Sequence, residues 1–156
     1  MTSTMDWLLI LVDQCFDRKA WHGPHLKAAI RGVDAAQAVW RPQPRRHNIA
    51  EQVLHAAYWK YVVRRKLRGD KRGSFPLKGT NWFPVRGKLR DEAWAEHKNL
   101  LDEQHRLLRA AVAESAGGKR KALGEAQLRL ITGVAAHDAY HAGQIRMLRS
   151  MHEGAR

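Results

Sequence analysis

The sequence predicts an all-α protein, namely a four-helix bundle with a broken first helix and a long irregular crossover loop. Two observations predict this fold. Apolar residues recur every three or four positions through four segments, which is the period of a helix with one buried face. We found no segment with the alternating pattern of a half-buried strand. Because 156 residues suit one domain, we expect residues 1–156 to form a single helical unit.

Residues 4–18 predict the first helix, since they contain the apolar run Trp7–Val12. Trp21–Pro24 interrupts that helix, because glycine and proline break regular helices. Shorter helical pieces are then expected over His25–Gly32 and Asp34–Trp40. The first helix is therefore predicted to be broken.

The second principal helix has clear signals at both ends. Asn48 can cap its first turn and Glu51 can complete a capping box. The helix is expected to run to about Arg68, with Gly69 as its stop. Residues 69–90 follow as a glycine- and proline-containing loop, whose aromatic residues predict that it packs onto the helices.

Two more helices are expected in the second half of the chain, over about 91–114 and 123–150, joined by a turn at 115–118. Gly133 and Gly143 in the last of these helices predict close packing by a neighbouring helix.

The composition restricts the class of protein. Cys15 is the only cysteine, so neither an intrachain disulfide nor a cysteine-rich zinc site can form, and a reducing cytoplasm fits. The apolar run Trp7–Val12 is far shorter than the roughly 20 residues that span a bilayer. No basic stretch precedes it, as a secretory signal would require. We therefore expect a soluble cytoplasmic protein that does not enter a membrane.

His137 and His141 are the central feature of the last helix, because residues four apart lie on one helical face. Two imidazoles so placed can bind one divalent metal, although they can also be hydrogen-bonded core residues. His55 lies on the flank of the apolar stripe of the second principal helix. Facing helices often supply one site between them, and three ligands leave an open position typical of a catalytic metal.

The chain resembles a known family in four segments: His47–His55 with Trp59, Arg65–Gly69, the helix break Ala20–Pro24, and the last-helix segment His137–Ile145. Together these segments are similar to DinB-like (damage-inducible, YfiT-like) four-helix-bundle proteins. The likeness extends from about residue 6 to residue 150.

The resemblance implies a divalent metal, usually zinc or nickel, held by His55, His137 and His141. It also implies a frequent homodimer and, in some relatives, hydrolase or thiol-dependent transferase activity on a small molecule. We therefore expect a metal-binding protein that is a candidate metal-dependent hydrolase or thiol transferase. The alternatives are a non-catalytic metal-binding stress protein and a basic helical module that binds nucleic acid.

No catalytic residue is assigned from the sequence. Glu51 can act as a base, although the capping box is favoured for it. Asp138 and Gln144 can orient an imidazole or a bound water, and Tyr140 can donate a hydrogen bond or simply pack.

The other histidines are expected to play lesser parts. His97 is the best substitute ligand if His55 fails, and His105 is placed at the edge of an apolar stripe. His47 is expected to be exposed and His152 to lie in a frayed tail. His22 and His25 can approach the mouth of the site, and this list completes the nine histidines.

The net charge is +13, and the sequence contains a dense basic run: Arg64, Arg65, Lys66, Arg68, Lys71 and Arg72, continued by Lys78, Arg86, Lys88 and Arg90, with Arg45 and Arg46 before the helix and a smaller cluster at Lys119–Lys121. Such a run can contact phosphates of nucleic acid or attract an anionic substrate. A solvated face is the favoured interpretation, because the sequence contains no nucleic-acid-binding motif.

Overall fold

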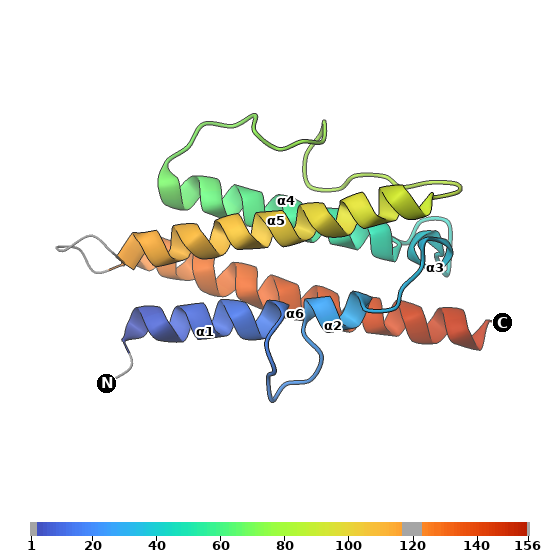
Figure 1. Cartoon of the computed structure of the whole chain (residues 1–156), viewed down its shortest axis with the longest axis horizontal. Coiled ribbons are helices and arrows are strands. Elements are labelled where there is room, and N and C mark those ends of the chain that lie inside the picture. Colours follow the sequence, from blue (N-terminus) through green and yellow to red (C-terminus); the bar gives the residue numbers. More distant parts are fainter. Residues whose placement is uncertain (1–2, 117–122, 156) are drawn as a thin grey trace.

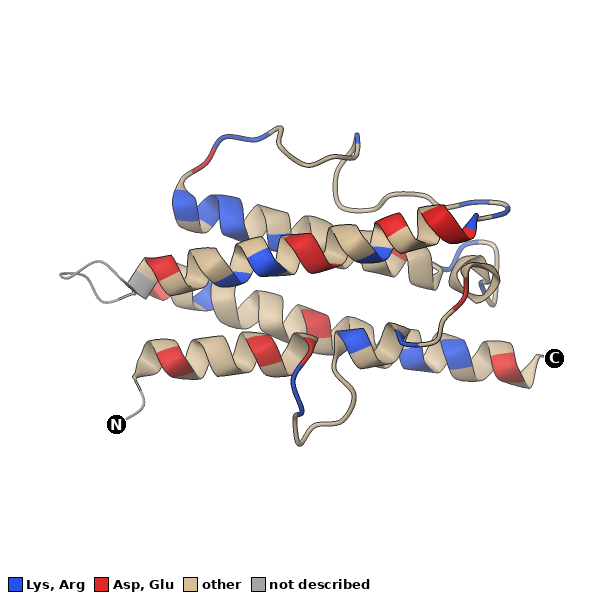
Figure 2. Ribbon diagram, in the orientation of Figure 1, with Lys and Arg blue, Asp and Glu red and all other residues tan. Residues whose placement is uncertain are grey.

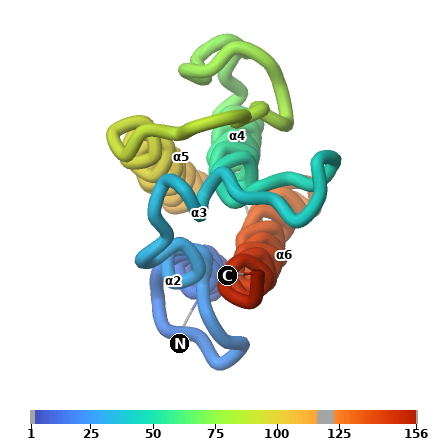
Figure 3. The backbone as a smooth tube through the Cα atoms, turned by 90° about the vertical axis from the view of Figure 1, so that its right-hand side faces the viewer, coloured from blue at the N-terminus to red at the C-terminus, as the bar shows by residue number. Residues whose placement is uncertain are grey.

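The computed structural model describes residues 3–116 and 123–155. These residues form six helices and no strand, so the all-α prediction is confirmed. The helices are α1 (Thr4–Phe16), α2 (Leu26–Ile30), α3 (Ala35–Val39), α4 (Ile49–Arg68), α5 (Asp91–Ala116) and α6 (Glu125–Gly154). The longer helices α1, α4, α5 and α6 lie side by side, as both the side view (Figure 1) and the end view (Figure 3) show.

The helical path from α1 to α2 is interrupted as the sequence predicts. Both helices pack against α6, and they follow one another along the same side of it (Figure 1). The His25 side chain begins α2, because its Nδ1 accepts a hydrogen bond from the Ala28 N–H at 3.1 Å. His25 therefore serves as a helix cap.

The start of α4 is fixed by the predicted capping box. Asn48 Oδ1 accepts from the Glu51 N–H at 2.8 Å, and Glu51 Oε2 accepts from the Asn48 N–H at 3.4 Å. At the other end Gly69 has a φ of 73°, the left-handed conformation that commonly ends helices. Local signals thus place both ends of the helix that carries His55.

The segment between α4 and α5 has no helix, and its aromatic residues pack onto α4 as predicted. The rings of Phe75 and Phe83 lie 5.3 Å and 5.6 Å from the ring of Tyr58 on α4. The segment also contains Asn81, whose φ of 65° is positive. The ring contacts hold this segment against the outer face of α4.

The core also contains a buried ion pair. Lys60 of α4 is completely buried, and its ammonium group contacts the carboxylate of Asp138 on α6. His105 of α5 lies against the same ammonium, with Nδ1 at 3.3 Å from Lys60 Nζ. His105 was expected at the edge of an apolar stripe, but it is buried and stacks on Phe16 at 3.6 Å.

Two expectations about α6 are wrong. A Cβ added at Gly133 or Gly143 would meet no atom within 4 Å, so neither glycine allows close approach of a neighbour. The helix also continues past the expected end at Ser150, and His152 lies within it, with its ring 5.3 Å from that of Trp40.

Part of the predicted turn at 115–118 and the cluster Lys119–Lys121 lie outside the described residues. Among the helices that the structure describes, none combines the length and the apolar character needed to cross a membrane.

Candidate metal centre

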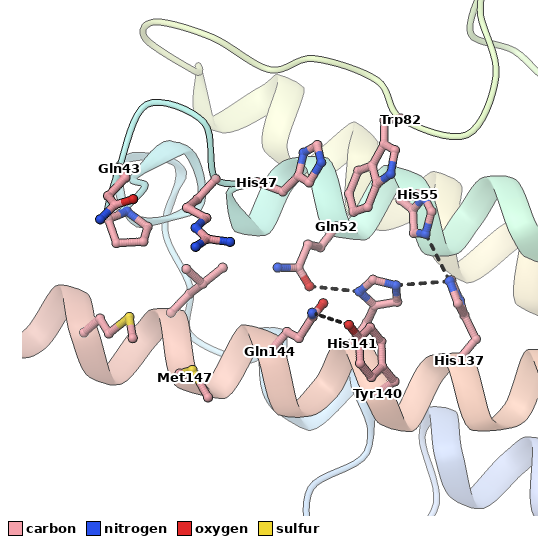
Figure 4. Close-up of a pocket in the computed structure, with 14 residues that line it drawn as sticks. Gln43, His47, Gln52, His55, Trp82, His137, Tyr140, His141, Gln144 and Met147 are labelled. Atoms are coloured by element: carbon pink, nitrogen blue, oxygen red, sulfur yellow. Dashed lines mark hydrogen bonds between the residues drawn. The ribbon is translucent and has the colours of Figure 1, made fainter.

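Three histidines from two helices meet at the contact between α4 and α6. His55 is buried on α4, while His141, buried, and His137, half-buried, lie one turn apart on α6. Their candidate ligand atoms all lie within 4.8 Å of one another (Figure 4). The structure thus brings together the three histidines that the sequence singled out.

The ring orientations are set by two hydrogen bonds on the outer side of the cluster. His55 Nδ1 donates to the backbone oxygen of Asn81 at 2.8 Å, and His141 Nδ1 donates to Gln52 Oε1 at 2.9 Å. Carbonyl and amide oxygens only accept, so in both neutral rings the proton sits on Nδ1 and Nε2 has a free lone pair. His137 Nε2 lies 3.0 Å from each of these two Nε2 atoms.

Protons alone cannot satisfy these three nitrogens. A neutral His137 with its proton on Nε2 has one hydrogen for two facing lone pairs, and its Nδ1 is buried without a partner. A divalent cation accepts all the lone pairs at once. Two nitrogens bound to a tetrahedral metal lie about 3.3 Å apart, close to the 3.0 Å between neighbouring Nε2 atoms here. The donor set therefore fits a divalent metal.

Burial keeps the three imidazoles neutral. Burial, together with the neighbouring histidines, lowers the pKa of His137 to about 4 and that of His141 to about 3. Burial also lowers the pKa of His55, partly offset by the hydrogen bond to Asn81. All three rings can thus offer lone pairs at neutral pH, as metal ligation requires.

Trp82 and Gln52 complete the surroundings of the cluster. The Trp82 ring stacks on His55 at 3.8 Å and on the exposed His47 at 3.6 Å, so it lies between them. Sequence reasoning missed both roles. Gln52 precedes His55 by three residues, and that helical spacing was an available signal. Trp82 comes from the irregular segment, where no periodicity indicates what a side chain faces.

Two acidic residues near the ligands do not serve the site. Asp138 was expected to be able to orient an imidazole or a water, but its carboxylate pairs with Lys60 inside the core. Glu51 accepts hydrogen bonds from Arg41 and from the Val85 N–H in addition to its capping bond. Although burial acts to raise the pKa of Glu51, these bonds and His47 lower it, so the carboxylate is held charged in a structural role.

The remaining polar candidates are placed as follows. Tyr140 is 62% exposed, with its ring 5.1 Å from that of His141, and its hydroxyl accepts a hydrogen bond from Gln144 Nε2 at 2.9 Å. His97, the proposed substitute ligand, is half-buried on α5 and lies outside the cluster. His47 is exposed, as expected. Neither His22 nor His25 lines the pocket at the histidines.

The cluster opens on a pocket of about 750 Å³. Its lining residues are Pro42, Gln43, Arg46, His47, Gln52, His55, Trp82, His137, Tyr140, His141, Gln144, Met147, Leu148 and Met151. Figure 4 shows the three histidines at one end and Met147 toward the other. Among the residues that the structure describes, no aspartate or glutamate lines this pocket, so it suits a neutral or anionic molecule with an apolar part.

Comparison with known proteins agrees with this geometry. Residues 21–145 match the DinB superfamily, a family that in general binds metal. Searches of curated proteins and of solved structures gave no match. The matched segment covers most of the chain and includes all three histidines of the cluster, so this protein belongs to the DinB superfamily.

Proposed function

We propose that this protein is a cytoplasmic, divalent-metal-binding four-helix bundle in which His55, His137 and His141 hold zinc or nickel. One observation carries the proposal: His137 Nε2 lies at hydrogen-bond distance from Nε2 of both His55 and His141, with too few protons to join all three nitrogens. Neutral imidazole is a suitable ligand for both metals, so the donor set supports either.

We further propose that the site works as a metal-dependent hydrolase or thiol-dependent transferase. A metal held by three protein ligands supplies Lewis-acid activation of a water or a thiolate at its open position. Gln52 and Asn81 keep His141 and His55 in the tautomer that exposes Nε2. Trp82 covers the His55 ring, and the pocket of about 750 Å³ is large enough for a small-molecule substrate.

Metal content tests the first proposal. Protein purified without a tag, a chelator or a nickel resin is analysed by elemental mass spectrometry, together with His55→Ala, His137→Ala and His141→Ala. His22→Ala is the matched control, because His22 is exposed and lies outside the pocket. We expect about one metal ion per chain in the wild type and the control, and less than about a tenth of that in the three variants. Full occupancy in any of the three, with a native circular dichroism spectrum, would refute the site.

Turnover tests the second proposal. Wild type and His137→Ala are compared on ester substrates and on pairs of a thiol with an electrophile. Turnover by the wild type that disappears in the variant supports an enzyme. Full metal occupancy without turnover on either class favours the non-catalytic metal-binding stress protein.

We also propose a homodimer. Exposed apolar side chains support it, since Trp7, Tyr140 and Met147 are each at least 60% exposed. Light scattering after size-exclusion chromatography measures the mass directly. A mass of 17.8 kDa, that of one chain, at every concentration tested would remove this proposal.

A further inference from the structure

A second large pocket lies between the outer face of α4 and the irregular segment that follows it. Its volume is about 610 Å³. It is lined by Tyr58, Trp59, Tyr61, Val62, Arg65, Lys66, Arg72, Gly73, Phe75, Leu77, Lys78, Gly79, Thr80 and Asn81. Lysine and arginine gather at the C-terminal end of α4 and along this segment, as Figure 2 shows. None of the three histidines of the candidate metal centre lines this pocket.

The charge of this basic pocket is not balanced. Its lining includes Arg65, Lys66, Arg72 and Lys78 and, within residues 3–116 and 123–155, no acidic residue. These four side chains form no ion pair with the described residues. A cleft lined by one sign of charge concentrates the field and attracts ions of the opposite sign.

Two other pockets are also lined by cations, but in both of them acidic residues accompany the cations. The pocket at α3 is lined by two cations, Lys88 and Arg90, and by two acids, Asp91 and Glu92. The pocket beside His105 is lined by three aspartates along with its four arginine and lysine residues. Their charges cancel wholly or largely, whereas those of the basic pocket add.

Interaction with the helix dipole explains the position of only two of the four cations. Arg65 and Lys66 lie in the last turn of α4, where cations complement the carbonyl end of the helix. Arg72 and Lys78 lie beyond the helix and return to the same pocket. Tyr61 fixes the start of the segment against α4, because its hydroxyl accepts a hydrogen bond from the Gly73 N–H at 3.1 Å.

A hydrogen bond also attaches a later part of the segment to α4. Trp59 Nε1 donates to Asn81 Oδ1 at 2.9 Å, and the Phe75 ring lies 5.4 Å from that of Tyr61. The lining thus contains a group of aromatic rings, and cations from both α4 and the segment lie in the same lining. This combination suits a ligand with both a flat ring and several negative charges.

We propose that the basic pocket binds a small organic polyphosphate, of the class of a nucleoside di- or triphosphate. Four cations match an anion with three or four charges better than a single phosphate. A pocket of about 610 Å³ also leaves room for the organic part beside the aromatic rings. Asn81 is common to both sites, since it lines this pocket and accepts the hydrogen bond from His55. The four cations lie outside the lining of the pocket at the histidines, so we expect the polyphosphate to bind with or without the metal.

Isothermal titration of the full-length protein with ATP, pyrophosphate and adenosine tests the proposal. The variant Arg72→Ala/Lys78→Ala removes two cations from the pocket. Arg86→Ala/Lys88→Ala is the matched control, since it removes one arginine and one lysine from the same segment outside the pocket. We expect the first variant to weaken ATP at least about tenfold and the control to stay within about twofold. Pyrophosphate should retain most of the affinity and adenosine little.

His137→Ala separates this proposal from the metal centre, because the variant changes the histidine cluster and leaves the basic pocket intact. We expect it to bind ATP as the wild type does. Loss of ATP binding in His137→Ala alone would instead place the anion at the metal and overturn the proposal. No binding of ATP or pyrophosphate to the wild type would overturn it as well.

A single-stranded oligonucleotide of twelve residues tests the remaining rival. Tighter binding than ATP, weakened equally by the pocket variant and by the control, would indicate a diffuse nucleic-acid surface and overturn the proposal. Weaker binding than ATP would support the pocket.

Discussion

Two polar clusters lie at the same contact between α4 and α6, and they are built in opposite ways. In one, the charges of Lys60 and Asp138 cancel each other within the core. In the other, the Nε2 atoms of His55 and His141 both face Nε2 of His137, and all three nitrogens can donate a lone pair. The charges of the ion pair balance within the chain, although Asp138 Oδ1 has no hydrogen-bond partner among the described residues. The histidine cluster has more facing lone pairs than protons, so a cation would complete it. The comparison separates a structural polar cluster from a binding site.

The two clusters are adjacent in sequence, since His137 and Asp138 are consecutive. Consecutive residues on a helix point about 100° apart, so His137 faces the pocket while Asp138 faces Lys60. Lys60 also has Nζ 4.6 Å from the centre of the Phe16 ring. The ion pair joins the two helices next to the ligands and thereby helps to fix how these helices meet.

The largest expected effect of a single substitution follows from breaking the ion pair. Asp138→Ala leaves the Lys60 charge buried and unpaired, which should lower the free energy of unfolding by about 3–5 kcal/mol. Urea denaturation followed by circular dichroism measures this. The double variant Lys60→Met/Asp138→Leu should recover most of the loss, because it removes both charges. A single variant within about 1 kcal/mol of wild type would contradict the assigned role.

The next effect concerns the second region. Gln52→Leu removes the acceptor that orients His141, and we expect metal affinity to fall by about 10- to 100-fold. Competition with a chelating dye measures the affinity. Gln43→Leu is the control, because Gln43 lines the same pocket without a hydrogen bond to a histidine ring. Equal affinities of Gln52→Leu and Gln43→Leu would show that the hydrogen bond does not orient the ligand.

Lowering the pH should destabilise the metal-free protein through the histidine cluster and through His105, which lies beside the ion pair. Burial lowers the pKa of His105 to about 2, that of His137 to about 4 and that of His141 to about 3. Below pH ~6.5 the unfolded chain takes up protons at these groups and the folded chain does not, so stability falls as the pH falls. Each group contributes a slope of about 1.4 kcal/mol per pH unit until its folded pKa is reached.

Urea denaturation at pH 7, 6 and 5 measures this slope. His105→Phe removes one of the three groups and should make the slope shallower. Equal stability of the wild-type protein at pH 7 and pH 5 would contradict the account.

The smallest expected effect is that of removing His137, and it separates the two clusters most clearly. In the metal-free protein, His137→Leu should change the free energy of unfolding by less than about 1 kcal/mol, because His137 can give a hydrogen bond to only one of the two lone pairs that face it. With excess zinc the wild type should become more stable and the variant should not. A loss in metal-free His137→Leu as large as that of Asp138→Ala would erase the difference between the two clusters.

Local sequence signals account for much of the fold. The capping box at Asn48 and Glu51 and the stop at Gly69 define α4, and the i,i+4 spacing places His137 and His141 on one face. Each of these signals depends only on residues a few positions apart, so it can be recognised in the sequence alone.

The parts that the sequence did not predict depend on contacts between distant residues. Lys60 has the residue type of a surface position, yet Asp138, 78 residues later, makes its burial possible. Trp82 reaches His55 from a segment without regular structure. Periodicity cannot reveal such pairings, because each depends on how separate elements meet.

The most direct test of the central claim is a crystal structure of the zinc-loaded protein with anomalous scattering recorded at the zinc edge. The account predicts one strong peak about 2.0–2.1 Å from Nε2 of each of His55, His137 and His141. A peak elsewhere, or none at the three histidines despite excess zinc, would show that the cluster does not bind the metal.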